Sequence, residues 1–183
     1  MIIGESPGAE EDVEGIPFTG RAGRELGKEL KLAGLSTAAV NMGNRLMCHP
    51  DANRDPTQEE MDNCEPWITQ NVREVNPKVI VLFGRYAISW LSGTSGRVKD
   101  TEGLMYLDMC DGCGGKGGEH KDRYANNGKW QRQGKRCKGT MVRRLIAFVY
   151  HPASVLRGTP ENREKIVHQL RRVVAELKLT LGE

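Results

Sequence analysis

Four short, nearly continuous apolar runs separated by longer amphipathic segments constrain the fold of this chain more than any other feature. The runs occupy residues 1–3, 38–47, 78–84 and 144–150. A strand buried on both faces reads as such a run, because neither of its faces can carry polar side chains, and this is typical of parallel sheets covered by helices. The sequence therefore predicts an α/β fold, a three-layer α/β/α sandwich around a central four-stranded parallel sheet.

The segments between the apolar runs predict helices. Apolar residues recur at helical spacing at residues 23–35, 57–76, 85–93 and 159–179. The second of these has the clearest start, because Thr57 is followed three residues later by Glu60, the spacing of a capping box. Pro77 marks its end, since a proline cannot continue a helix.

The chain has 183 residues, which suits a single domain over residues 1–183. No apolar run approaches the roughly 20 residues of a membrane span, and the N-terminus has no basic segment followed by an apolar leader. We therefore expect an intracellular, cytoplasmic protein in a reducing compartment. We also expect a monomer with no membrane partner.

Basic residues are concentrated in one segment, although the net charge is only +3. Residues 114–144 contain ten Lys or Arg and two acids, so the rest of the chain is net acidic. Such an excess attracts a phosphate backbone, and Tyr124 and Trp130 lie within it. We interpret residues 108–140 as an insertion rich in Cys, Gly and basic residues. A solvated basic loop is the alternative.

The five cysteines favour metal binding over disulfides. An odd number does not form a closed set of disulfides, and thiols in a reducing compartment are often metal ligands. Cys110 and Cys113 have the C-x-x-C spacing that turns two sulfurs toward one ion or cluster. A metal site is therefore predicted.

A residue that suits a binding site lies at the end of each predicted strand or directly after it. These residues are Glu5, Asn44, Gly84 and His151. The carboxyl ends of parallel strands meet at one edge of the sheet, where α/β proteins bind their ligands. The turn GESPG lacks the glycine spacing of nucleotide-binding loops, and its carboxylate would repel phosphate. We therefore predict a site at this edge that does not bind a nucleotide phosphate.

Several motifs resemble, in order, those of family 4 uracil-DNA glycosylases, the iron–sulfur-containing branch of their superfamily. The motifs are GESPGAEEDVEGIPFTGRAG, NRLMCHPDANRDPTQEE, NCEPW, PKVIVLFGRYA and YHPASVLR. The resemblance covers Met1 to about Arg157, apart from the basic insertion. It implies an enzyme that extrudes uracil or a related modified pyrimidine from DNA and hydrolyses the N-glycosidic bond, leaving an abasic site.

The resemblance also implies roles for four residues. Phe18 would stack on the base, and the Asn44 amide would pair with O4 and N3 of uracil. His151 would donate a hydrogen bond to O2 as negative charge develops there. Glu5 would position water or favour the cationic sugar. Ser6 departs from the family, which more often has alanine or glycine at this position, and would add a hydroxyl near the base. Taken singly, each residue also has an ordinary structural interpretation, as core, turn or helix-end side chain.

Four cationic residues are predicted to contact DNA. They are Arg157, Lys135, Arg136 and Lys138. Arg157 ends the last matched motif, and the other three belong to the basic insertion. A non-catalytic binder of damaged or single-stranded DNA that keeps the fold is the alternative function, and a catalytically inactive decoy is another.

For the metal, the resemblance implies a [4Fe–4S] cluster. Family members carry a C-x-x-C upstream of the first strand, at which this sequence begins, while Cys48 and Cys64 match the family's other pair. We expect Cys110 and Cys113 to complete a four-thiolate set with Cys48 and Cys64. The alternative is zinc bound by Cys110, Cys113 and Cys137, with or without His120.

Overall fold

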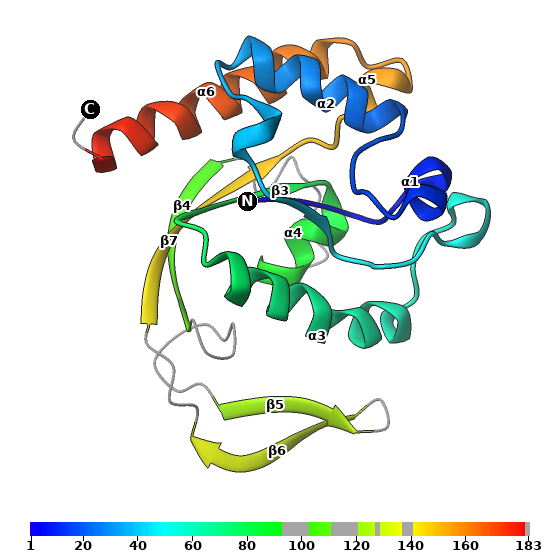
Figure 1. Ribbon diagram of the computed structural model, residues 1–183, viewed down its shortest axis with the longest axis vertical. Helices are drawn as coiled ribbons and strands as arrows, with labels where there is room; N and C mark the ends of the chain where they lie inside the picture. Colours follow the sequence, from blue (N-terminus) through cyan, green and yellow to red (C-terminus); the bar gives the residue numbers. More distant parts are fainter. Residues whose placement is uncertain (93–102, 111–120, 127–128, 137–140, 182–183) are drawn as a thin grey trace.

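The computed structural model describes residues 1–92, 103–110, 121–126, 129–136 and 141–181. A five-stranded sheet with the order β2-β1-β3-β7-β4 forms its centre, and a separate two-stranded ladder pairs β5 with β6. Figure 1 shows helices on both faces of the larger sheet. The predicted three-layer α/β/α class is confirmed.

The strands of the central sheet are mostly parallel. They are β1 (Ile2–Gly4), β2 (Met42–Asn44), β3 (Val79–Phe83), β4 (Gly103–Cys110) and β7 (Met141–Val149). β1, β2, β3 and β7 pair in parallel, as predicted. β4 adds a fifth, antiparallel strand at the edge beside β7. This strand was not predicted, because its apolar run is confined to residues 104–107 and Asp108 interrupts it.

Two helical layers enclose the sheet (Figure 1). The helices are α1 (Ala9–Glu14), α2 (Arg21–Leu32), α3 (Gln58–Val75), α4 (Arg85–Ser92), α5 (Ala153–Leu156) and α6 (Glu161–Leu181). Short 3-10 turns occur at η1 (Thr37–Ala39) and η2 (Asp51–Asn53). None of the helices in the described ranges combines the length and the apolar composition that crossing a membrane requires.

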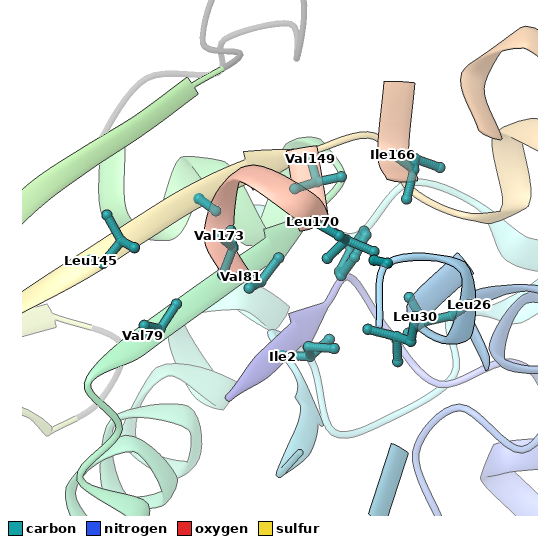
Figure 2. Packing of buried hydrophobic residues seen from close by; sticks show 13 residues of the cluster. Ile2, Leu26, Leu30, Val79, Val81, Leu145, Val149, Ile166, Leu170 and Val173 are labelled. Atoms are coloured by element: carbon teal, nitrogen blue, oxygen red, sulfur yellow. The ribbon is translucent and has the colours of Figure 1, made fainter. Parts of the chain in front are cut away.

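Side chains of each strand alternate between two apolar layers, since successive residues of a strand point to opposite faces. Ile2 and Val81 pack with α2 and α6 in one layer, where Figure 2 shows Leu30 and Leu170 close to the strands. On the other face, Ile3 packs with residues of α3 and α4. Burial on both faces is the physical reason for the continuous apolar runs.

The capping predictions for α3 are confirmed. The Thr57 hydroxyl accepts a hydrogen bond from the Glu60 amide, and the Glu60 carboxylate accepts one from the Thr57 amide. At its other end, Asn76 adopts a left-handed conformation, and its side-chain oxygen accepts a hydrogen bond from Arg144 Nη2 at 2.8 Å. Arg144 is buried. It therefore anchors the end of α3, although the sequence placed it in the basic segment.

The predicted insertion contains regular structure. β5 (Lys121–Asn126) and β6 (Lys129–Arg136) form an antiparallel hairpin in which Arg123 pairs with Arg132. The ladder brings basic residues of the two strands into register, a placement that the linear charge count could not show.

Candidate active site

A cavity of ≈ 530 Å³ opens at the carboxyl ends of the parallel strands. Its volume lies in the range of small-molecule sites. The predicted residues that line it are Glu5, Ser6, Phe18, Asn44, His151 and Arg157. The structure therefore brings the predicted catalytic and base-binding residues together, with Arg157 beside them.

Gly4 allows Phe18 and Asn44 to approach one another. A Cβ at Gly4 would lie 2.6 Å from Asn44 Oδ1 and 2.7 Å from Phe18 Cζ. Both contacts are shorter than real Cβ atoms show. The missing side chain thus leaves the aromatic ring and the buried amide side by side at the end of β1.

Phe18 is held in an unusual backbone conformation. Its φ is 62°, in the left-handed region that non-glycine residues seldom occupy. A Cβ at Gly23 would lie 1.8 Å from Phe18 O, so only glycine allows the start of α2 to pack against this turn. Such strained conformations are common at binding sites.

The Glu11 carboxylate joins the two loops that form this side of the cavity. It accepts hydrogen bonds from Gly8 N at 3.1 Å and Gly20 N at 2.8 Å. Gly8 ends the Ser-Pro-Gly turn, and Gly20 follows the turn that carries Phe18. Sequence reasoning did not single out Glu11, because the acidic run offered several equivalent carboxylates.

His151 is held in one tautomer. The Ala153 amide donates a hydrogen bond to His151 Nδ1 at 3.2 Å, so Nδ1 is an acceptor and the proton lies on Nε2. Burial lowers the pKa of His151, the Glu5 carboxylate opposes this shift, and the Arg157 guanidinium adds to it. The imidazole is therefore neutral at pH 7 and presents one N–H donor.

Glu5 lies at the N-terminus of α4. Its Oε1 accepts a hydrogen bond from Tyr86 N at 3.2 Å, where the helix dipole favours negative charge. A Cβ at Gly84, whose φ is 85°, would lie 2.6 Å from the Glu5 carboxyl carbon. Gly84 is therefore required both for the left-handed turn and for the close approach of this carboxylate.

A third loop, after β2, completes the wall of the cavity. Arg54 and Asp55 line it together with Tyr86. Asp55 forms an ion pair with Arg85, and hydrogen bonds from Arg85 and then Tyr86 lower the pKa of its carboxyl group. Sequence reasoning missed these residues. Arg54 and Asp55 could have been found from their position after a predicted strand, within the motif NRLMCHPDANRDPTQEE.

The remaining residues predicted to contact DNA lie in the insertion. Lys135 and Arg136 belong to β6. Lys138 lies outside the described residues. Their contact with DNA stays a prediction.

Cys48 and Cys64 lie next to one another. The Cys64 sulfur accepts a hydrogen bond from Met47 N at 3.4 Å. Loss of hydration raises the pKa of the Cys48 thiol, and the adjacent Cys64 raises it further, in part through a hydrogen bond between the two thiols. Two thiols facing each other form half of a four-thiolate set. Among the residues that the structure describes, no group of three or more His, Cys, Asp or Glu could hold a metal.

The observed sheet separates the Cys110 backbone from this pair, and the predicted role of Cys110 as a metal ligand stays a prediction. Cys110 pairs with Met141 at the start of β7, whereas the carboxyl end of β7 is at Val149. The eight residue steps from Met141 to Val149 span roughly 26 Å along the strand. β4 and β2 also form opposite edges of the sheet, so Cys110 and the loop after β2 lie at opposite corners.

Cys113 follows Cys110 by only three residues, which span at most about 11 Å. Cys113, like Cys137 and His120 of the zinc alternative, lies outside the described residues.

Comparison with known proteins identifies the family. Residues 1–174 match the model of the "Uracil DNA glycosylase superfamily". A type-4 uracil-DNA glycosylase of Archaeoglobus fulgidus is 31% identical over 173 residues, which cover 94% of this chain and 74% of that protein. One from Pyrobaculum aerophilum is 32% identical over 86% of this chain and 67% of its own length.

A third relative, the type-4 uracil-DNA glycosylase of Saccharolobus solfataricus, is 40% identical over half of this chain. The matched part spans only 43% of that relative's length. The family match covers the strands and the residues that line the cavity, and it ends within α6. The chain belongs to the uracil-DNA glycosylase superfamily.

Proposed function

We propose that this protein is a uracil-DNA glycosylase that releases uracil, or a related modified pyrimidine, from DNA. The observation that carries the proposal is the convergence of Phe18, Asn44, His151 and Glu5 on one cavity. The names of the relatives support the same activity. The target atom of a base stacked in a duplex is out of reach of these side chains, so the nucleotide must be extruded into the cavity.

The base would be held between an aromatic face and an amide. The Phe18 ring offers a stacking surface, and its strained turn restricts where that surface lies. The Asn44 amide can accept from N3–H and donate to O4, whereas the amino group of cytosine would face its donor. Since both side chains are fixed around Gly4, recognition requires little rearrangement.

His151 would stabilise the departing base. As the bond between C1′ and N1 breaks, its electron pair moves to the base and negative charge builds on O2. The Nε2–H of neutral His151 can donate to that oxygen, with Nδ1 held by the Ala153 amide. Water then supplies a hydroxyl to C1′ and a proton to the base. Glu5 would orient this water and favour the positive charge on the sugar.

The test is single-turnover base release by His151→Ala. Its donor would act mainly in the transition state, so release should slow by about a hundredfold to a thousandfold while DNA binding changes little. Asn44→Ala should weaken both capture and rate. His168→Ala, which replaces an exposed histidine of α6, is the matched control. This variant should release the base at the parent rate.

Two results would contradict the proposal. A folded His151→Ala protein that releases uracil at the parent rate would overturn the assigned role. A parent protein that binds uracil-containing DNA but releases no pyrimidine base would favour the non-catalytic binder.

The basic residues would contact the DNA backbone. Arg157 lines the cavity, and Lys135, Arg136 and Lys138 supply further positive charge from the insertion. Replacing these three insertion residues with glutamine should weaken binding to every sequence and reduce the salt dependence by up to about one slope unit for each lost phosphate contact. An unchanged salt slope would reassign the hairpin to a solvated structure.

We further propose that Cys48 and Cys64 bind a metal group, an iron–sulfur cluster in view of the family resemblance. Their sulfurs are adjacent, and cysteine sulfurs are the usual ligands of iron–sulfur clusters. Among the described residues, no third His, Cys, Asp or Glu completes a metal-holding group with them. Bound metal would tie the loop after β2 to α3 and so stabilise one wall of the cavity.

Protein purified without oxygen should be brown, with about four irons per chain if the group is [4Fe–4S]. Cys64→Ser should lose the colour. Stoichiometric zinc without iron would favour the zinc alternative over the cluster. Serine substitution of Cys48 would then show whether Cys48 and Cys64 bind the zinc.

A further inference from the structure

His49 joins the loop after β2 to the turn that carries Glu5. Its ring Nδ1 lies 2.9 Å from Pro7 O, and its backbone amide donates a hydrogen bond to Asp12 Oδ1 at 3.2 Å. A carbonyl oxygen only accepts hydrogen bonds, so Nδ1 carries a proton and is the donor in this contact. His49 is therefore the reverse of His151, whose Nδ1 is an acceptor.

The His49 ring continues the contact between two segments at the point where their backbones part. The Leu46 amide donates to Glu5 O at 2.9 Å and extends the pairing of β1 with β2 beyond the strands. The amide of the next residue, Met47, donates instead to a sulfur of α3. The loop backbone has turned away from the Glu5 turn here, and the His49 side chain supplies the next donor, to Pro7 O.

Two side chains hold one peptide unit of this turn from opposite ends. The Pro7 carbonyl and the Gly8 amide belong to the same peptide bond. The carbonyl accepts from His49, and the amide donates to Glu11 Oε2 at 3.1 Å. Glycine by itself leaves the orientation of such a peptide open, because it has no Cβ. With both ends held, the peptide cannot rotate without breaking these hydrogen bonds.

The held peptide belongs to the wall of the cavity. Pro7 and Gly8 are among the residues that line the cavity, whereas His49 is not. They end the short turn that begins at Glu5, so their orientation limits where the Glu5 carboxylate can lie. His49 therefore acts on the cavity through this turn and not by touching a substrate.

We propose that His49 is a positioning residue for base release. The inference rests on the proposed glycosylase function, in which Glu5 orients water and favours the positive charge on the sugar. The His49 Nδ1–H holds the Pro7 carbonyl and so keeps the Glu5 carboxylate in its place at the cavity. Holding a catalytic group in its productive geometry lowers the barrier of the chemical step, so His49 should affect the rate of release more than the binding of DNA.

Single-turnover base release by His49→Phe tests this role. Phenylalanine keeps an aromatic ring but has no donor, so release should slow by about tenfold while DNA binding changes by less than about twofold. His49→Asn offers an amide N–H near the position of Nδ1 and should restore most of the rate. His168→Phe, at an exposed position of α6, is the matched control and should keep the parent rate.

A double-mutant cycle with Glu5→Gln separates positioning from a general loss of stability. If His49 acts through Glu5, adding His49→Phe to the Glu5→Gln protein should slow release by less than about twofold further, because the group that His49 positions has already been changed. A destabilising change without a link to Glu5 would multiply the two effects, and that result would overturn the inference.

Nitrogen NMR of the parent protein measures the contact itself and needs no variant to fold. The His49 imidazole should carry a proton on Nδ1, and an imidazole protonated only at Nε2 would overturn the inference. Release at the parent rate by a folded His49→Phe protein would also overturn it and leave the proposed function standing. If the parent releases no base from any pyrimidine substrate, the proposed function is wrong and the role of His49 is overturned with it.

Discussion

Replacing Glu29 tests the electrostatics of the helical layer formed by α2 and α6. Glu29 is fully buried, and neither carboxyl oxygen has a hydrogen-bond partner among the described residues. Burial, and next the negative charge of Glu25, raises the pKa of Glu29 from 4.5 to about 8, although Arg163 and Lys28 oppose the shift. Arg163 donates to Glu25 at 2.8 Å, so its charge is already engaged. Glu29 is therefore protonated in the folded protein at pH 7.

The sign of the pH dependence follows from this pKa. Between pH 4.5 and about 8 the folded chain keeps the Glu29 proton and the unfolded chain releases it. Stability therefore decreases as pH rises through this window. At about 1.4 kcal/mol per pH unit, the loss reaches about 3 kcal/mol at pH 7. Glu29→Met removes the ionisable group at similar volume, so it should stabilise the protein by up to that amount.

Urea unfolding at several pH values between 5 and 8 measures the effect. The free energy of unfolding of Glu29→Met should exceed that of the parent by a margin that widens as pH rises. Glu14→Gln, a change at an exposed carboxylate of α1, is the control and should follow the parent curve. Parallel pH profiles for Glu29→Met and the parent would refute the reasoning, since the difference would then not come from Glu29 ionisation.

Two further substitutions test local features of the fold and the cavity. Gly4→Ala would place a methyl group 2.6 Å from Asn44 Oδ1 and 2.7 Å from Phe18 Cζ. It should therefore weaken uracil binding and base release by at least about tenfold in a folded protein. Calorimetry with free uracil measures the binding, and an unchanged affinity would contradict this prediction. Thr57→Ala removes the α3 cap and should lower the free energy of unfolding by about 1 kcal/mol without altering base release, whereas an unchanged unfolding midpoint would show that the cap contributes nothing.

Local patterns in the sequence were sufficient for the parallel sheet and for the start of α3. Residues 78–84 read as a strand because both faces of β3 are buried, and the spacing of Thr57 and Glu60 shows a capping box without any tertiary contact. Asn44 at the end of one predicted strand and His151 after another were placed at the same edge of the sheet. The sequence thus determined which residue types could meet there, because the carboxyl ends of parallel strands converge.

Only the tertiary structure decided the distances and the protonation states. Strand order and register place Cys110 at the corner of the sheet opposite Cys48, although the C-x-x-C spacing alone fits a shared metal. The tautomer of His151 depends on the Ala153 amide, and the pKa of Glu29 depends on a helix more than a hundred residues away in the chain. Sequence periodicity reports which faces are buried. It does not report which distant groups share that burial, and those groups set the chemistry.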